Sequence, residues 1–176
     1  RALLRRVTGR EPVIIGEGPE DVPPHHIGMF LTPLDDGRRT VLVGDPRAGL
    51  RLLTPALERR LPRPVQRDPA FLARFERVAA SARRAGFRVV RTPLVPLDDG
   101  LTYVTYNNAL LERRLDGRLH AYVPQFGLPA LDAAGRRVYE AQGVVVHPID
   151  VQRIYADNGT VRCLVNVLDR LSSRGQ

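Results

Sequence analysis

The chain has 176 residues, of which 43% are hydrophobic and 26% are charged, and this composition suits one globular domain and excludes a disordered protein. No apolar run approaches the roughly 20 residues that a transmembrane helix needs, and no charged-then-apolar leader is visible, so we expect a cytoplasmic protein with no membrane partner. The basic residues behind the net charge of +8 are all arginines scattered in pairs, a distribution that argues against a nucleic-acid partner.

A helix and a strand are expected first, over ALLRRVTGREPVII (2–15), followed by a unit of the order strand, strand, helix, strand. An N-cap at Asp68 before Pro69 and apolar residues at helical spacing indicate the helix, and Gly86 ends it. The first two strands flank a turn at Asp35-Asp36-Gly37. The predicted elements of this unit are IGMFLTPL (27–34), TVLVG (40–44), the helix between Asp68 and Gly86, and FRVVRTPLV (87–95).

The same order of signals returns in the second half of the chain, with a weaker helix that ends at Gly143. After this second unit, GTVRCLVNVL (159–168) predicts a further strand. Since such units cannot bury both faces alone, we expect the two to pack side by side. The elements of the second unit are LTYVTYNNALL (101–111), HAYVPQF (120–126), the helix that carries Leu131, Ala134, Val138 and Ala141, and VVVHPI (144–149).

The chain contains one cysteine, Cys163, and four histidines without an HxxxH or CxxC pattern. One cysteine cannot form an internal disulfide or, by itself, a structural zinc site, so we expect no metal. Cys163 is then either a buried residue of the last predicted strand or a nucleophile. We expect His25 and His120 at the surface and His147 at the end of a strand.

Four motifs occur in an order that resembles the pentein superfamily, the guanidine-modifying enzymes built as five-bladed α/β propellers, and in particular agmatine and peptidylarginine deiminases. Asn107 also lies where agmatine deiminases tend to place an asparagine. The motifs are His26–Phe30 for the family's H-x-D segment, Tyr122–Gly127 for V-P-x-F-G, Val144–Asp150 for the strand that ends in I-D, and Gly159–Cys163 for the nucleophile motif G-x-V-[HR]-C.

The resemblance implies an α/β, pentein-type propeller of ββαβ units that is incomplete in this chain. Residues 1–176 are then a single domain that holds the C-terminal blades, with roughly two of the five blades absent. Two arrangements would supply the rest of a ring: N-terminal blades outside this chain, or a homo-oligomer.

The resemblance also implies a deiminase that acts on a small guanidino compound such as agmatine, or on the side chain of a peptidyl arginine. Cys163 would attack the central carbon and form a covalent thiouronium adduct, and His26 would transfer the protons. Substrate-binding residues would be Asp157, Gly159 and Asn107. This mechanism requires no organic cofactor and no metal.

One position departs from the family pattern: Gly28 stands where the family has the aspartate of H-x-D, and a glycine cannot bind a guanidinium. Other carboxylates that could replace it are Glu20, Asp21 and Asp157. Two alternatives to a deiminase therefore stay open. The chain is a catalytically silent pentein that binds RNA or protein, or it is an amidinotransferase, in which an amine instead of water resolves the adduct.

Overall fold

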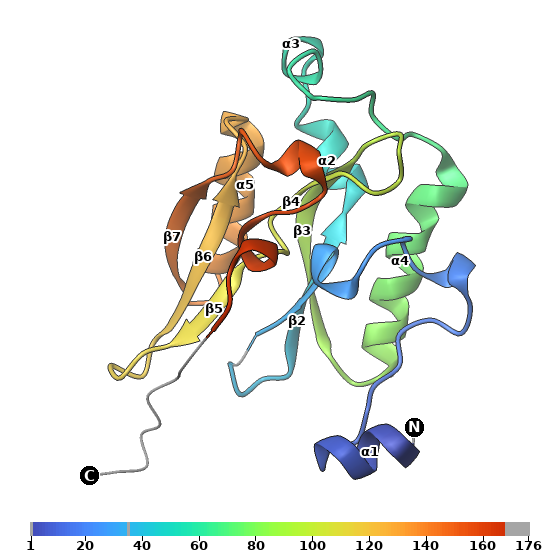
Figure 1. The fold of residues 1–176 in the computed structure, drawn as a ribbon, viewed down its shortest axis with the longest axis vertical. Helices are drawn as coiled ribbons and strands as arrows, with labels where there is room; N and C mark the ends of the chain where they lie inside the picture. Colours follow the sequence, from blue (N-terminus) through green and yellow to red (C-terminus); the bar gives the residue numbers. More distant parts are fainter. Residues whose placement is uncertain (1, 35, 168–176) are drawn as a thin grey trace.

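The computed structural model describes residues 2–34 and 36–167, which form a mixed α/β structure (Figure 1). Within these residues the strands make two sheets, one of four strands in the order β1-β2-β3-β4 and one of three in the order β5-β6-β7. The strands are β1 (Leu31–Pro33), β2 (Thr40–Asp45), β3 (Arg88–Pro96), β4 (Tyr103–Thr105), β5 (Leu110–Arg113), β6 (Leu119–Gln125) and β7 (Val145–Asp150).

The predicted order of strand, strand, helix and strand occurs twice. In the first unit β1 pairs antiparallel with β2, and β2 pairs parallel with β3 through the crossover helix α4 (Pro69–Arg84). In the second unit β5 pairs antiparallel with β6, and β6 pairs parallel with β7 through α5 (Pro129–Glu140). A parallel pair needs such a crossover, which explains why a long helix lies between the second and third strands of each unit.

Helix α4 begins and ends at the residues that the sequence indicates. The Asp68 carboxylate accepts hydrogen bonds from the backbone N–H groups of Ala70 (3.1 Å) and Phe71 (3.2 Å). Gly86, with φ +82°, ends the helix in the left-handed conformation that glycine tolerates. The buried face of the helix packs against the first sheet through Phe71, Phe75, Val78, Ala79 and Ala82.

A second core lies between the two units. Tyr106, Leu131 and Tyr139 are fully buried there. Gly135 on α5 lets the helix approach the Tyr106 ring, because a Cβ atom at this glycine would lie 2.3 Å from the ring carbon Cγ. Because Leu42 and Val95 of the first unit belong to the same cluster, the two units share this second core.

Several predicted boundaries are wrong. The helix at the start exists as α1 (Ala2–Thr8), but no strand forms over 12–15. Short helices α2 (Pro46–Arg51) and α3 (Pro55–Glu58) occupy a region that we expected to be a loop. Residues Ile27–Met29 form the 3₁₀ helix η2 instead of the beginning of a strand.

The strand predicted over 101–111 is in fact two strands in different sheets, β4 and β5, joined by a bend at 106–108. The strand predicted over 159–168 is also wrong, because Val161–Leu164 form the 3₁₀ helix η4 and no strand follows as far as residue 167. Asp35 of the first predicted turn and Leu168 of the last predicted strand lie outside the described residues.

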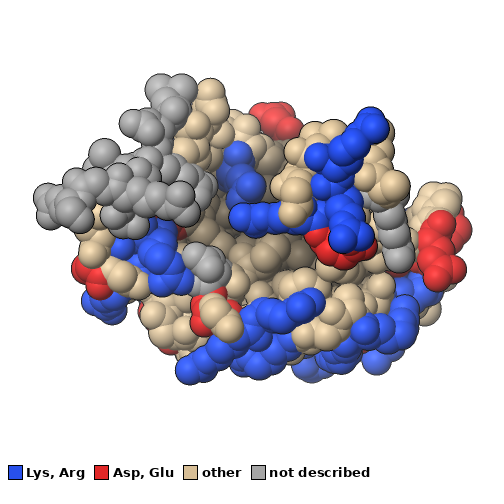
Figure 2. All heavy atoms as spheres, turned by 90° about the horizontal axis from the view of Figure 1, so that it is seen from below, with Lys and Arg blue, Asp and Glu red and all other residues tan. Residues whose placement is uncertain are grey.

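The remaining helices are the 3₁₀ turns η1 (Pro19–Asp21) and η3 (Tyr155–Asp157). No helix in the described ranges combines the length and the apolar character needed to cross a bilayer. On the face shown in Figure 2, arginines line the lower edge and others lie across the middle, with a few acidic groups between them. Several arginines pair with carboxylates, for example Arg91 with Glu76 at 2.7 Å.

Candidate functional site

Cys163 lies on the exposed turn η4, and its thiol is free. The turn is closed by a hydrogen bond from the Cys163 backbone N–H to the carbonyl oxygen of Thr160 (3.1 Å). The interpretation of this residue as a buried strand cysteine is therefore wrong. An accessible thiol is a requirement for a nucleophile, although it does not by itself make a site.

His26 lies directly before η2, on a short segment that follows Pro23 and Pro24. Its backbone N–H donates to Nδ1 of His25 at 2.8 Å, which fixes the direction of the chain at this point. The His26 ring then reaches the thiol: Nε2 is 3.5 Å from Cys163 Sγ across a sequence separation of 137 residues. In Figure 1 the blue segment before β1 and the red segment after β7 lie side by side at this contact.

Asn108, at the bend between β4 and β5, holds the cysteine turn in place. Its Oδ1 accepts hydrogen bonds from Thr160 Oγ1 (2.8 Å) and the Arg162 backbone N–H (2.9 Å). The Cys163 thiol lies 3.5 Å from the same oxygen as a third donor. Asn108 is therefore a residue of the site, and sequence reasoning missed it because nothing in the pattern separates two adjacent asparagines.

The neighbouring Asn107, which we expected to bind substrate, points into the core. Its Nδ2 donates to the carbonyl oxygen of Leu42 (3.0 Å) and to Thr32 Oγ1 (3.3 Å), and the residue is 1% exposed. Since both amide protons are used inside the protein, the structure gives Asn107 a packing role. The expected asparagine contact with the site comes from the next residue.

Of the other two predicted binding residues, Gly159 lies beside the thiol and Asp157 makes no contact with it. A Cβ atom at Gly159 would lie 3.3 Å from Cys163 Cβ and 3.9 Å from Sγ, so the glycine keeps the approach to the thiol open. Asp157 is exposed at the end of η3. Its carboxylate has no hydrogen bond or ion pair with any described residue, so no contact links it to the thiol or to the His26 ring.

Gly28 lies beside both site side chains. A Cβ atom built on it would be 3.3 Å from Cε1 and Nδ1 of the His26 ring and 3.9 Å from Nδ2 of Asn108. A side chain at position 28 would therefore point between these two residues. This is the place where a carboxylate from the protein is absent.

The two earlier carboxylates that could have replaced it are used elsewhere. Glu20 forms an ion pair with Arg74 on α4. The Asp21 carboxylate accepts hydrogen bonds from the backbone N–H groups of Glu17 and Gly18, both at 3.1 Å, and these bonds lower its pKa from the ordinary value. Neither carboxylate makes a contact with the thiol or the imidazole.

The other titratable neighbour is His25, whose ring lies 4.8 Å from that of His26 between centroids. Partial burial, followed by the adjacent His26, lowers the pKa of His25. The described residues contain no group of three or more His, Cys, Asp or Glu side chains arranged to hold a metal ion. The site is thus a thiol, an imidazole and a buried amide.

The other two histidines form a separate pair, and both predictions for them are wrong. His120 is buried rather than exposed, and His147 lies in the middle of β7 rather than at its end. His120 Nδ1 and His147 Nε2 are 2.8 Å apart, the two rings stack, and the Tyr122 ring also stacks on that of His147. Strand pairing between β6 and β7 causes this contact.

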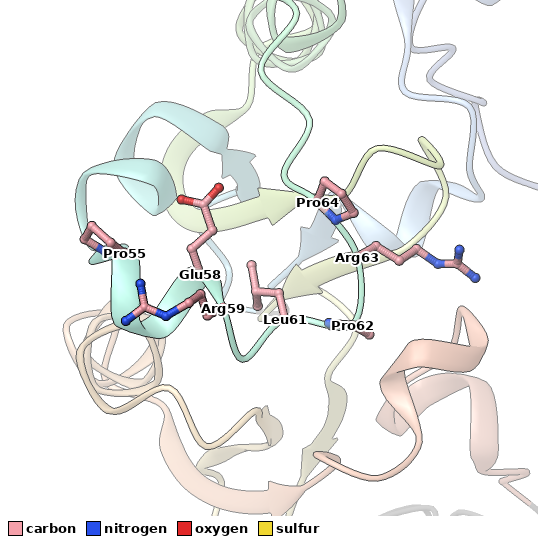
Figure 3. Close-up of a pocket in the computed structure, with 7 residues that line it drawn as sticks. All are labelled: Pro55, Glu58, Arg59, Leu61, Pro62, Arg63 and Pro64. Atoms are coloured by element: carbon pink, nitrogen blue, oxygen red, sulfur yellow. The ribbon is translucent and has the colours of Figure 1, made fainter.

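A pocket of about 480 Å³ lies elsewhere, at α3 and the proline-rich segment after it (Figure 3). It contains neither the thiol nor any histidine, so we base the functional argument on the chemistry at Cys163 and not on this hollow. Its lining residues are Pro55, Glu58, Arg59, Leu61, Pro62, Arg63 and Pro64.

Comparisons with family models, with curated proteins and with solved structures found no match for this chain.

Proposed function

We propose that the protein is a hydrolase of C–N bonds in guanidino compounds, a deiminase with a pentein-like arrangement of ββαβ units, in which Cys163 is the nucleophile and His26 the general acid and base. The observation that carries the proposal is the distance of 3.5 Å between Cys163 Sγ and His26 Nε2, two exposed side chains from opposite ends of the chain. Such a pair is the minimum that covalent cysteine catalysis needs.

The reaction balances with these two residues and water. The Cys163 thiolate attacks the guanidinium carbon, and His26 gives a proton to the departing nitrogen, which leaves as ammonia and produces an S-alkylthiouronium adduct. His26 then takes a proton from water as the water oxygen attacks the same carbon. The C–S bond breaks, the remaining hydroxyl proton passes to solvent, and the products are a ureido compound and the restored thiolate.

Affinity labelling tests the proposal. A haloacetamidine, which carries the amidinium group of a guanidine analogue, should alkylate Cys163 at least about tenfold faster than the neutral haloacetamide does, because a guanidinium site attracts the cation. Arginine peptides or guanidino acids should slow the labelling. Because the chain has a single cysteine, the mass increase reports on Cys163 alone.

The variants His26→Asn and His25→Asn form a matched pair for the same assay. His26→Asn removes the imidazole beside the thiol and should slow labelling by roughly tenfold or more at neutral pH. His25→Asn retains an acceptor for the His26 backbone N–H and should label like the original protein. Equal rates in all three proteins, together with no ureido product, would contradict the proposed chemistry.

The second candidate is a catalytically silent binding module, and one observation favours it. No carboxylate among the described residues contacts the thiol or the imidazole, whereas a guanidinium normally requires such a partner. A protein that is not labelled by the haloacetamidine but binds RNA with a strong dependence on salt would support this candidate. An amidinotransferase differs from the deiminase only in the last step, and an added amine would then appear in the product.

A further inference from the structure

The space above Gly28 is bordered by two nitrogen atoms that have no hydrogen-bond partner among the described residues. The first is Nδ2 of Asn108, which is buried and has no hydrogen-bond partner in the described structure. Asn108 as a whole is 0% exposed. Leaving a buried N–H group unpaired is unfavourable, so an acceptor from outside the chain would be stabilised there.

The assignment of this nitrogen as a donor is fixed by its neighbours. The other end of the amide, Oδ1, receives the backbone N–H of Arg162 at 2.9 Å, and a backbone N–H can only donate. Exchanging the two ends of the amide would place two donors against each other. Asn108 Nδ2 is therefore a hydrogen-bond donor that requires an oxygen acceptor.

The second nitrogen is Nδ1 of His26. While Nε2 faces the thiol, Nδ1 lies 3.3 Å from the Cβ position of Gly28 and has no hydrogen bond to any residue that the structure describes. When the thiol transfers its proton to the imidazole, both ring nitrogens carry hydrogen and the ring is positive. The space above Gly28 then faces two N–H groups and a positive charge.

We propose that this space is a carboxylate subsite and that the ligand, rather than the protein, brings the carboxylate. One carboxylate oxygen accepts from Asn108 Nδ2 and the other from His26 Nδ1. This inference rests on the proposed function and names its substrate class: a guanidino acid with a short linker. The linker is short because Oδ1 and Nδ2 belong to one amide, and Oδ1 is already 3.5 Å from Cys163 Sγ.

A carboxylate in this position has a defined chemical effect. It stabilises the protonated imidazole, and the protonated imidazole stabilises the thiolate. The bound ligand thus completes a row of thiolate, imidazolium and carboxylate. A long guanidino amine such as agmatine cannot do this, and it leaves Asn108 Nδ2 unpaired.

The first experiment uses acetate as the probe and requires no turnover. The rate at which neutral chloroacetamide alkylates Cys163 is measured in sodium acetate and in sodium chloride at equal ionic strength. We expect a saturable increase of roughly threefold to tenfold in acetate. Asn108→Asp retains the Oδ1 acceptor but loses the donor and adds a negative charge, and Gly28→Ala fills the space, so both should lose the acetate response.

The two variants keep this test decisive. The methyl group that Gly28→Ala introduces would lie 3.3 Å from Cε1 and Nδ1 of the His26 ring and 3.9 Å from Asn108 Nδ2. A small shift of the exposed His26 ring accommodates it, so the fold is expected to persist, and circular dichroism checks this. No acetate effect in the original protein, or an equal effect in Asn108→Asp, would overturn the carboxylate subsite.

The second experiment compares the original protein with Gly28→Asp and measures how fast each converts guanidinoacetate and agmatine. The original protein should convert guanidinoacetate in preference to agmatine. The variant carries its own carboxylate, so it should reverse this order by repelling the acid and accepting the amine. If the original protein prefers agmatine, the subsite is wrong while the deiminase proposal stands. If neither compound reacts and Cys163 is not labelled, the proposed function itself fails.

Discussion

The long helices of the two ββαβ units are capped, and attached to the rest of the molecule, in different ways. Both helices have proline in the first turn. Asp68 caps α4 from outside and bonds only to backbone N–H groups of its own helix. Asp132 lies inside α5, is buried, and accepts hydrogen bonds from the N–H groups of Phe126 (3.0 Å) and Leu128 (2.8 Å) and from the Tyr106 hydroxyl (2.8 Å).

This difference matters because the second arrangement leads to the candidate site. Tyr106 begins the bend whose last residue is Asn108. The carbonyl oxygen of Tyr106 also accepts a hydrogen bond from the Tyr139 hydroxyl at 2.6 Å. The buried hydrogen bonds of α5 to Tyr106 therefore fix the bend at 106–108, and Asn108 in this bend fixes the cysteine turn. The cap of α4 stabilises only its own unit. A substitution that breaks the contacts of α5 should therefore change the candidate site, and one that removes the cap of α4 should not.

The largest effect is expected for Asp132→Ala. Three donors lose their acceptor in a buried place, and we expect a loss of about 4 kcal/mol in the free energy of unfolding, measured by urea denaturation. In the folded fraction, the alkylation rate of Cys163 should no longer depend on His26. If Asp132→Ala leaves this dependence intact, the bend is not held through α5.

Alkaline pH should produce the next largest effect, mainly through the second unit. Burial, with the nearby Asp132 as a second cause, raises the pKa of Tyr106, and burial raises the pKa of Tyr139. The folded state thus keeps protons that the unfolded state loses. The stability is fully present below about pH 10 and falls above it by about 1.4 kcal/mol per pH unit for each such tyrosine.

The midpoint of urea unfolding at about pH 9, 10 and 11 measures this effect, and Tyr106→Phe should reduce the slope. Tyr103 on β4, in the four-stranded sheet, also contributes, because burial raises its pKa. An unfolding midpoint that does not change over this pH range would contradict the assignment.

The smallest effect is expected for Asp68→Ala, which removes the cap of α4 and should cost about 1 kcal/mol of stability. The alkylation rate of Cys163 and its dependence on His26 should be unchanged. A change as large as that in Asp132→Ala would remove the distinction between the two units.

Much of the fold could be predicted because its signals are local. Asp68 and Gly86 define the ends of α4, and alternating or continuous apolar runs predict β2, β3, β6 and β7. The failures occur where a strand depends on a distant partner. Val161–Val165 has the composition of a strand, but Leu164 is 64% exposed and no neighbouring strand pairs with it among the described residues.

The site could be predicted only in part. The resemblance indicates Cys163 and His26, and no local pattern indicates that they meet. The resemblance does not distinguish Asn107, which we expected to bind substrate, from Asn108. The bend at 106–108 turns these neighbours in opposite directions, one into the core and one toward the thiol. Only the tertiary structure determines which of two adjacent asparagines faces the site.

The sequence separation of 137 residues between His26 and Cys163 also has a kinetic consequence. Loop-closure entropy opposes contacts between remote segments, so contacts within each unit are expected to form before this one during refolding. The contact between His26 and the Cys163 thiol should then appear after the helices and most of the tyrosine burial. A pulse of alkylating reagent during refolding would therefore measure when this last contact forms. The reporter is Cys163 Sγ, the same atom that is proposed to act as the nucleophile.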